Sequence, residues 1–455
     1  MKRKPRVQTD WKRILSIVIA IIIGLSAYMY PLGLEQPAQA VMAIMLFAGV
    51  LWFTEAFPLW VTALMVPPLL VVGAGIQPKQ AYYPFFDPII ALLLGGFVLA
   101  LGIQNTGLDR RIAGLFVRAF GNRPKMYLLG LMAATAFLSF WISNTASTLL
   151  MIPIGIAAVT ASGLKPMKSE YCKTVMLGIG YSATIGGVGT LIGTPPNLIA
   201  VSFLADAGIK VGFLDWMVHA LPLVVIMVLV AWVVLSLQHR SEVKEVKAPG
   251  LDGRRLTRGQ KMTLAVFFLT ALLWVTDTFH GVHNSVVAMI PIIGLYALGI
   301  LKKDDLRNVK WSVLILVGGG LTLGSAIHAT GLDMFIASGL SGLLMGQPEF
   351  VMYLVIGLFA IAFTAFVANT AGAAILVPIG IPMATMLGID PMLMAILIGI
   401  VVSFDFIVPV GTPPNAIAYG TGYITVKDML KSGIAISLIG ALVVACFGAF
   451  IWPLF

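Results

Sequence analysis

Two short polar motifs, each of which occurs twice in an otherwise apolar chain, hold the residues whose types and spacing could do chemistry. Ser-Asn-Thr-Ala at 143–146 recurs as Ala-Asn-Thr-Ala at 368–371, and Gly-Thr-Pro-Pro-Asn occurs at both 193–197 and 411–415. Two consecutive prolines remove backbone donors and stop a helix, so nearby carbonyl oxygens lose their intrahelical partners. Such a break is tolerated at membrane depth only where it lines a polar cavity. The pattern predicts a twofold-repeated site for a small hydrophilic solute.

The chemistry available at these segments suits both a cation and an anion. Unwound carbonyls with Ser, Thr and Asn oxygens are ligands of the kind that hard cations such as Na⁺ take. Half-helix N-termini aimed at the same point supply partial positive charge for a carboxylate. Ser139 and Thr364, each five residues before the segment's Asn, add a hydroxyl in matched positions. The alternative for these two hydroxyls is a hydrogen bond to a carbonyl of their own helix.

Asp405 is the only carboxylate that falls well inside a predicted span, six residues before Gly411. An ionisable residue at membrane depth is a functional candidate by default, so Asp405 is a possible coupling acid that carries a proton or tunes a cation site. The alternative is a neutral or hydrogen-bonded Asp that faces the helix bundle.

The amino-acid composition indicates the class of protein, and therefore the kind of element, that positions these residues. The chain is 59% hydrophobic and only 11% charged, whereas a soluble domain carries about 25% charged residues. An all-α polytopic membrane protein follows, and the spans hold no Ser/His/Asp, Cys/His or metal-ligand constellation of an enzyme. The net charge of +10 does not indicate a nucleic-acid partner, because no basic face is interleaved with aromatic residues.

Apolar runs predict about eleven crossings and two longer blocks, at about 20 residues a crossing. The crossings are 14–30, 38–57, 59–76, 88–106, 172–206, 216–237, 261–279, 282–300, 312–330, 391–420 and 430–454, and the blocks are 126–160 and 349–386.

Positive charge decides how the two blocks are threaded. If both blocks are re-entrant hairpins and the N-terminus is cytoplasmic, 27 of the 29 Lys and Arg residues lie on the cytoplasmic side, all but Lys79 and Lys210. This bias is the one expected of membrane proteins. The prediction is an integral protein of the cell (plasma or inner) membrane, with its N-terminus in the cytoplasm and its C-terminus outside.

The second half of the chain repeats the first. Thr-Gly-Leu-Asp occurs at 106–109 and 330–333, and Pro-Ile-Gly-Ile at 153–156 and 378–381. Because the two hairpins would enter from opposite sides, the repeats are inverted, as in secondary transporters. The predicted parts are scaffold helices of repeat 1 (1–106), a transport part (107–237), a cytoplasmic loop (238–260), scaffold helices of repeat 2 (261–330) and a second transport part (331–455).

The paired tips, each followed by Gly-Thr-Pro-Pro-Asn, resemble the divalent anion:sodium symporter family of dicarboxylate, citrate and sulfate carriers. The resemblance covers essentially the whole chain. It implies eleven spans with two hairpins, a homodimer in membrane lipid, and a transport part that moves as an elevator. It also implies two or more Na⁺ sites and no organic cofactor. By resemblance, Na⁺ would meet Ser139, Ser143, Asn144 and Gly193 in one half, and Thr364, Val367, Asn369 and Gly411 in the other; the substrate would meet Asn144, Thr145, Thr194, Pro195, Asn369, Thr370, Thr412 and Pro413.

Two residues of the second half depart from the family pattern. Ala368 stands where the pattern has Ser, and Asp405 where it usually has an uncharged residue. The resulting hypothesis is a Na⁺-coupled transporter of C4-dicarboxylates such as succinate, malate and fumarate. The alternatives are a Na⁺-independent dicarboxylate exchanger and a sulfate or inorganic-anion symporter with Na⁺.

Overall fold

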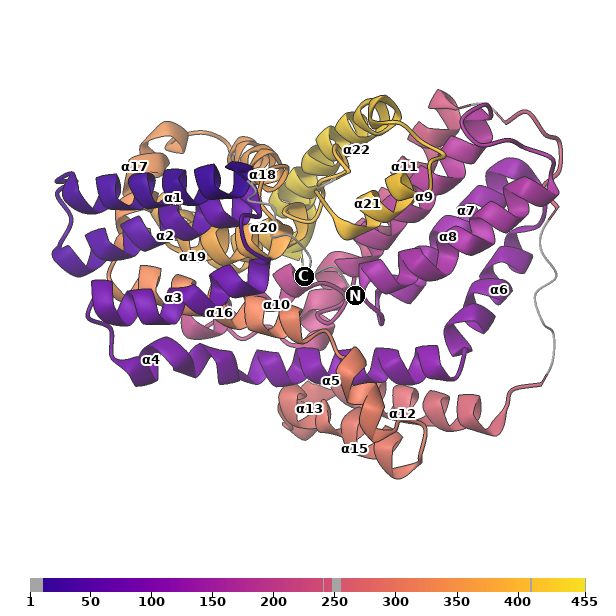
Figure 1. Ribbon diagram of the computed structural model, residues 1–455, viewed down its shortest axis with the longest axis horizontal. Coiled ribbons are helices and arrows are strands. Elements are labelled where there is room, and N and C mark those ends of the chain that lie inside the picture. Colours follow the sequence, from indigo (N-terminus) through magenta and orange to yellow (C-terminus); the bar gives the residue numbers. More distant parts are fainter. Residues whose placement is uncertain (1–10, 240, 248–254, 410, 455) are drawn as a thin grey trace, which may run out of the picture.

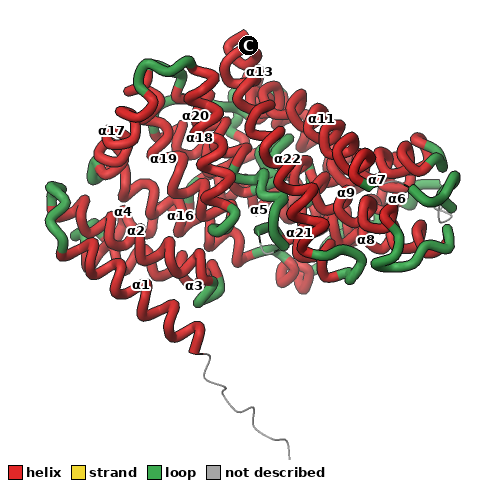
Figure 2. Tube along the Cα trace, turned by 90° about the horizontal axis from the view of Figure 1, so that it is seen from above, coloured by secondary structure: helices red, strands yellow, loops and turns green. Residues whose placement is uncertain are grey.

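The computed structural model describes residues 11–239, 241–247, 255–409 and 411–454. In this part of the chain every regular element is a helix and no strand occurs (Figure 2), so the all-α prediction is confirmed. Eight helices among the described residues are long and apolar enough to cross a membrane. Six of them coincide with predicted crossings, and the other two, α8 (Asn144–Ala161) and α19 (Asn369–Leu387), are the second arms of the predicted hairpins.

From α2 onward, the main helices of the first half recur in the same order from α12 onward in the second half. The first half comprises α1 Trp11–Met29, α2 Gln36–Thr54, α3 Leu59–Gly73, α4 Pro78–Tyr82, the 3₁₀ helix η1 Tyr83–Phe86, α5 Pro88–Asn105, α6 Leu108–Phe120, α7 Pro124–Ser139, α8, α9 Glu170–Gly187, α10 Pro195–Asp206 and α11 Phe213–Gln238. The second half comprises α12 Arg258–Val275, α13 Asp277–His280, α14 Asn284–Val287, α15 Met289–Ala297, the 3₁₀ helix η2 Lys303–Asn308, α16 Trp311–Ala329, α17 Leu332–Leu344, α18 Glu349–Thr364, α19, α20 Pro391–Val401, α21 Pro413–Gly420, α22 Val426–Cys446, the π-helix η3 Phe447–Ile451 and the 3₁₀ helix η4 Trp452–Leu454.

Length alone would let α8 cross the membrane, but its packing makes it the return arm of a hairpin. Along α9, contacts to α7 advance in chain order, whereas contacts to α8 run in reverse. In order along α9 the close pairs are Val175 with Gly155, Gly178 with Leu128, Gly186 with Ala136 and Gly187 with Asn144. The arms α7 and α8 are therefore antiparallel, and Figure 1 shows them side by side. In the second half, α18 and α19 likewise both pack on α20.

The short arms of the broken helices cross over between the halves. The arm α10 packs on α19 and α20, and α21 packs on α8 and α9 (Figure 1). The two crossings are equivalent in detail. A Cβ at Gly180 would lie 3.4 Å from the Pro414 carbonyl oxygen, and one at Gly399 would lie 3.6 Å from that of Pro196. This exchange places each Pro-Pro segment against the other half of the molecule.

Two short helices, α6 and α17, follow α5 and α16 in the two halves. Each begins after a glycine with positive φ, Gly107 at 67° and Gly331 at 71°, a conformation that other residues adopt only with strain. The next acidic residue is buried in both cases. Asp109 accepts from the backbone N–H of Arg110 at 2.8 Å, and Asp333 accepts a hydrogen bond from His328 Nδ1 at 2.6 Å. The repeated Thr-Gly-Leu-Asp is thus a repeated helix start.

Candidate ion and anion site

The Asn of each Gly-Thr-Pro-Pro-Asn segment closes the loop that precedes it. Asn197 is fully buried, and its Nδ2 donates to the carbonyl oxygens of Gly187 at 3.0 Å and Thr190 at 2.7 Å. These two carbonyls lie where α9 ends and the chain unwinds. A buried backbone carbonyl needs a partner, and the Asn197 amide supplies one to the last carbonyl of α9, where the helix ends, and a second one to Thr190, which also accepts from the Gly193 N–H.

The second half repeats this closure with equivalent residues. Asn415 is fully buried, and its Nδ2 donates to the carbonyl oxygens of Asp405 at 3.1 Å and Val408 at 3.0 Å. The spacing of donors and acceptors matches that of the first half. Position 405 is therefore the counterpart of Gly187, so the second half has a carboxylate where the first has no side chain.

At the first hairpin tip, several hydrogen-bond acceptor oxygens lie close together, and few donor protons are available to them. Ser139 Oγ is fully buried, 2.8 Å from Asn144 Oδ1 and 2.6 Å from the Ala183 carbonyl oxygen. One hydroxyl proton can serve only one of these two acceptors. A Cβ at Gly193 would lie 2.9 Å from the Ser139 carbonyl oxygen. Three predicted cation ligands, Ser139, Asn144 and Gly193, are thus close together, with spare acceptors that a cation would satisfy.

The second half contains oxygen atoms without partners. Asp405 is fully buried; its Oδ1 accepts from the Ile407 N–H at 3.2 Å, and its Oδ2 has no hydrogen-bond partner. That carboxylate faces Gly411 so closely that any Cβ there would collide with it. The Oδ1 atoms of Asn369 and Asn415 also lack hydrogen-bond partners. Buried acceptors without donors indicate a place for a cation or a proton.

Other predicted ligands of the second half are engaged elsewhere in this conformation. Thr364 Oγ1 donates to its own helix, at the carbonyls of Ala360 (2.9 Å) and Ile361 (3.3 Å). Its hydroxyl thus follows the back-bonded alternative, whereas that of Ser139 does not. Val367 packs in an apolar cluster with helices α2 and α3. The described contacts join Asp405, Gly411 and Asn415, and they do not tie Thr364 or Val367 to them.

Four helix N-termini carry the predicted anion-binding residues. Asn144 and Asn369 are the first residues of α8 and α19, and Pro195 and Pro413 those of α10 and α21. Thr194 and Thr412 are buried N-cap residues; Thr412 Oγ1 accepts from the Asn415 N–H at 3.3 Å. Free N–H groups and the helix dipole favour an anion at such ends. Helix α10 packs on α19, and α21 packs on α8, so each Pro-Pro helix lies against the hairpin arm of the other half.

Lys310 is a site residue that sequence reasoning missed. The charge pattern placed it among the cytoplasmic loop cations, yet its Nζ donates to Ser143 Oγ, the N-cap of α8. The two residues are 167 positions apart. The only signal in the sequence was that Lys310 directly precedes an apolar helix, α16, which is too general to assign a contact.

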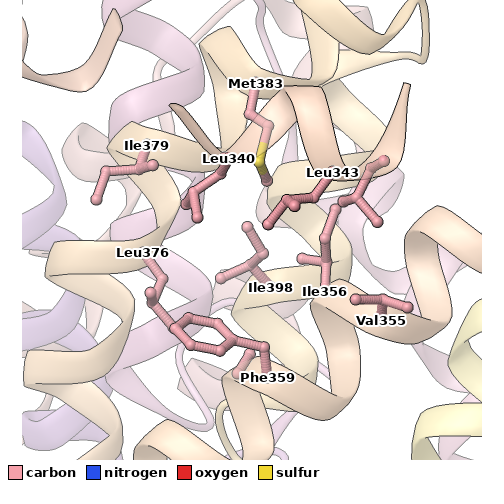
Figure 3. A pocket seen from close by; sticks show the side chains of 12 residues that line it. Leu340, Leu343, Val355, Ile356, Phe359, Leu376, Ile379, Met383 and Ile398 are labelled. Carbon is pink, nitrogen blue, oxygen red and sulfur yellow. The ribbon is translucent and has the colours of Figure 1, made fainter. Parts of the chain in front are cut away.

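A cavity lies between α17, α18, α19 and α20 (Figure 3), and none of the predicted site residues lines it. Its labelled side chains are all apolar, among them Leu340, Val355, Phe359, Leu376 and Met383. A lining without polar groups cannot compensate the desolvation of a dianion. The cavity is therefore not a candidate for the anion site.

Comparison with known proteins identifies the family. Residues 8–455 match the family described as the sodium:sulfate symporter transmembrane region. The chain belongs to this family. It is an integral membrane transporter and not an enzyme, as the sequence predicted.

Similar chains are named as transporters. An uncharacterized transporter of Haemophilus influenzae is 33% identical, over 96% of each chain. The sodium-dependent dicarboxylate transporter SdcS of Staphylococcus saprophyticus is 32% identical, over 96% of this chain and 91% of its own. The SdcS protein of Staphylococcus aureus is 31% identical, over 94% and 88%.

Solved structures share the architecture at low sequence identity. The Alcanivorax borkumensis YdaH transporter superposes with a TM-score of 0.63 at 14% identity, over 92% of this chain and 100% of its own. Neisseria gonorrhoeae MtrF, described as one of a class of antimetabolite efflux pumps, gives 0.58 at 14% identity, over 96% and 94%. These likenesses concern the fold alone.

Proposed function

We propose that this transporter carries small divalent anions, most specifically C4-dicarboxylates such as succinate, malate and fumarate, and that Na⁺ drives the uptake. Relatives named as sodium-dependent dicarboxylate transporters, at 31–32% identity over most of both chains, support the substrate and the ion. The observation that carries the proposal is the oxygen cluster of Ser139, Asn144 and the Ala183 carbonyl, which is rich in acceptors and poor in protons.

The roles that we propose for the residues are those that the family resemblance implies, with Asp405 added for its charge. In the first half Na⁺ binds among Ser139, Ser143, Asn144 and the Gly193 carbonyl. In the second half a cation binds among Thr364, the Val367 carbonyl, Asn369 and the Gly411 carbonyl, and Asp405 adds a charged oxygen as the coupling acid. The substrate carboxylates accept hydrogen bonds at the helix starts of Asn144, Thr145, Thr194, Pro195, Asn369, Thr370, Thr412 and Pro413.

Transport by an elevator motion is part of the proposal. The hairpins and broken helices (107–237 and 331–455) would move as one part against a scaffold of 1–106 and 261–330, joined by the loop 238–260. We further propose that the scaffold forms a homodimer in membrane lipid. The apolar cavity of Figure 3, between the second hairpin and α17, suits an acyl chain. Native mass spectrometry in lipid nanodiscs would test the dimer.

Uptake of labelled succinate into proteoliposomes tests the function. We expect an inward Na⁺ gradient to drive accumulation, and an equal K⁺ gradient to leave only background. Uptake that ignores Na⁺ but needs internal succinate would replace symport by exchange. Transport of sulfate without competition by succinate would change the substrate class.

Substitutions at the two tips test the site within the same assay. Asn144→Ala and Asn369→Ala should each abolish Na⁺-driven uptake, because each removes a cation ligand and a helix-start donor together. Asn308→Ala, at an exposed position of η2, is the matched control and should transport like the wild type. Wild-type uptake by either tip variant would remove that tip from the site.

A further inference from the structure

Lys310 introduces a full positive charge at the first hairpin tip. It is the last residue before α16, and its ammonium donates a hydrogen bond to Ser143 Oγ. The lysine belongs to a helix outside the hairpin, whereas Ser143 begins the hairpin's return arm. A charge carried by one part of the protein thus contacts a site carried by another.

No negative side chain balances this ammonium. Among the described residues no ion pair includes Lys310. The ammonium also lies at the N-terminus of α8, where the helix dipole is positive and favours anions over cations. Two positive sources at one point, without a counter-charge, make a favourable position for an anion.

The hydrogen bonds of Ser143 indicate the same sign of ligand. Its Oγ accepts from Lys310 and, at 3.3 Å, from the backbone N–H of Ala146. A hydroxyl oxygen has two acceptor positions and one proton. With both acceptor positions in use, the remaining hydrogen-bonding function of Ser143 is donation. In this conformation the hydroxyl is therefore prepared to donate to an anion's oxygen, so the atom that Ser143 offers to the proposed Na⁺ is its backbone carbonyl oxygen and not its Oγ.

We propose that Lys310 is a substrate-binding residue whose ammonium pairs with one carboxylate of a bound dicarboxylate, while Asn144 and Thr145 hold the same carboxylate from the hairpin. The inference rests on the proposed function, because it concerns the same anion site. The pairing selects dianions over monoanions. It also holds only while the hairpin lies beside the start of α16, so the lysine strengthens binding in this conformation and loses the substrate when the hairpin moves away.

The second half has no equivalent pair. The repeat places Phe86, which is exposed, at the position of Lys310, and Ala368, which has no hydroxyl, at the position of Ser143. The contact is therefore not a general consequence of the repeated fold. It is a property of this chain's own residues in the first half.

Calorimetric binding to the purified full-length protein, in detergent with saturating Na⁺, tests the pairing. The probes are succinate and its monoamide succinamate, which has a single carboxylate. A charge-assisted hydrogen bond of this kind predicts that Lys310→Gln weakens succinate binding about tenfold. The preference for succinate over succinamate should fall by a similar factor. Lys310→Arg should retain most of both, and Lys303→Gln, an exposed neighbour in η2, should match the wild type.

Three results would overturn the pairing. Unchanged succinate binding and unchanged preference in Lys310→Gln would make the lysine a structural residue. Tighter Na⁺ binding with unaltered succinate binding would make it a competitor of the cation. Wild-type preference in Lys310→Met, which keeps the apolar stem, would exclude the charge even if Lys310→Gln fails to fold.

Failure of the proposed function gives a different result. If the wild type binds no succinate, the substrate class is wrong, and the same variants are then measured with sulfate as the dianion. Loss of sulfate binding in Lys310→Gln, but not in Lys303→Gln, would retain the lysine as an anion partner. Equal sulfate binding in both variants would remove it.

Discussion

In the first half of the molecule, the niche beside Gly193 is occupied by two backbone carbonyl oxygens, those of Gly187 and Ser139. In the second half, the equivalent niche beside Gly411 is occupied by the carboxylate of Asp405. The loops around both niches are closed by the same hydrogen bonds, from Asn197 and Asn415. The backbone is therefore repeated, and the charge is not.

This difference shows how one loop geometry can hold ions in two ways. Carbonyl oxygens carry only partial charges, so a site that they form can lack a cation without a large electrostatic cost. A buried carboxylate without a partner is costly, and the cost is removed by a cation or a proton. The opposite asymmetry is found at the tips, where the first tip receives the positive Lys310 from the second half of the chain and the second tip receives no charge from the first. Substitutions that alter these differences, or the loop closures that the two halves share, test the comparison.

The largest effect is expected when the first half is given the second half's side chain. Gly187→Asp would place a Cβ against the Asn144 amide, where the structure has no space. Displacing the amide by about 1 Å would lower Na⁺-driven uptake by about 100-fold or more. Gly339→Asp, in open space on α17, is the control and should leave uptake unchanged. Activity in Gly187→Asp would mean that the Asn144 amide is not a ligand.

Removing the loop closures should affect both halves alike. Asn197→Ala removes the side-chain donor of the Gly187 carbonyl, and Asn415→Ala that of the Asp405 carbonyl, at a cost of about 1–3 kcal/mol in stability. The Thr190 and Val408 carbonyls keep backbone donors, from Gly193 and Gly411. Thermal unfolding of the purified variants measures it, and both midpoints should fall by similar amounts. A fall in only one variant would show that the two loops are not equivalent, contrary to their matching hydrogen bonds.

Removing the charge of Asp405 should change the Na⁺ dependence of uptake more than it changes the stability of the fold. Asp405→Asn keeps the side-chain shape and removes the formal charge, so we expect the Na⁺ concentration for half-maximal uptake to rise about tenfold. Asp390→Asn, an N-cap at the start of α20, is the control. An unaltered Na⁺ dependence in Asp405→Asn would assign the carboxylate to packing.

The smallest effect is expected from restoring the missing hydroxyl at the second tip. Ala368 precedes α19 with an extended backbone and no side-chain cap, whereas Ser143 caps α8. Ala368→Ser should stabilise the protein by about 1 kcal/mol through the new N-cap, with uptake changed by less than about threefold. Destabilisation would mean that the tip has no room for the hydroxyl.

The sequence by itself determined where the helices of the site break. Asn and Ser at helix starts and Pro-Pro act through their own backbone chemistry, so the starts of α8, α10, α19 and α21 lie at the motifs that predicted the breaks. Composition was equally sufficient for the membrane class, because it averages over the whole chain. The antiparallel arms of the two hairpins are a finding of the structure, whereas the side of the membrane from which each enters remains a prediction from the loop cations.

Only the tertiary structure decided which atoms meet. The exchange of α10 and α21 between the halves, the contact of Lys310 with Ser143, and the engagement of the Thr364 hydroxyl by its own helix depend on helix packing. Matched spacing made Ser139 and Thr364 equivalent in the sequence, yet their hydroxyls have different partners, because neighbours from distant segments differ. Local chemistry is readable along the chain, whereas the balance of charge within a site is the sum of contacts that the fold alone brings together.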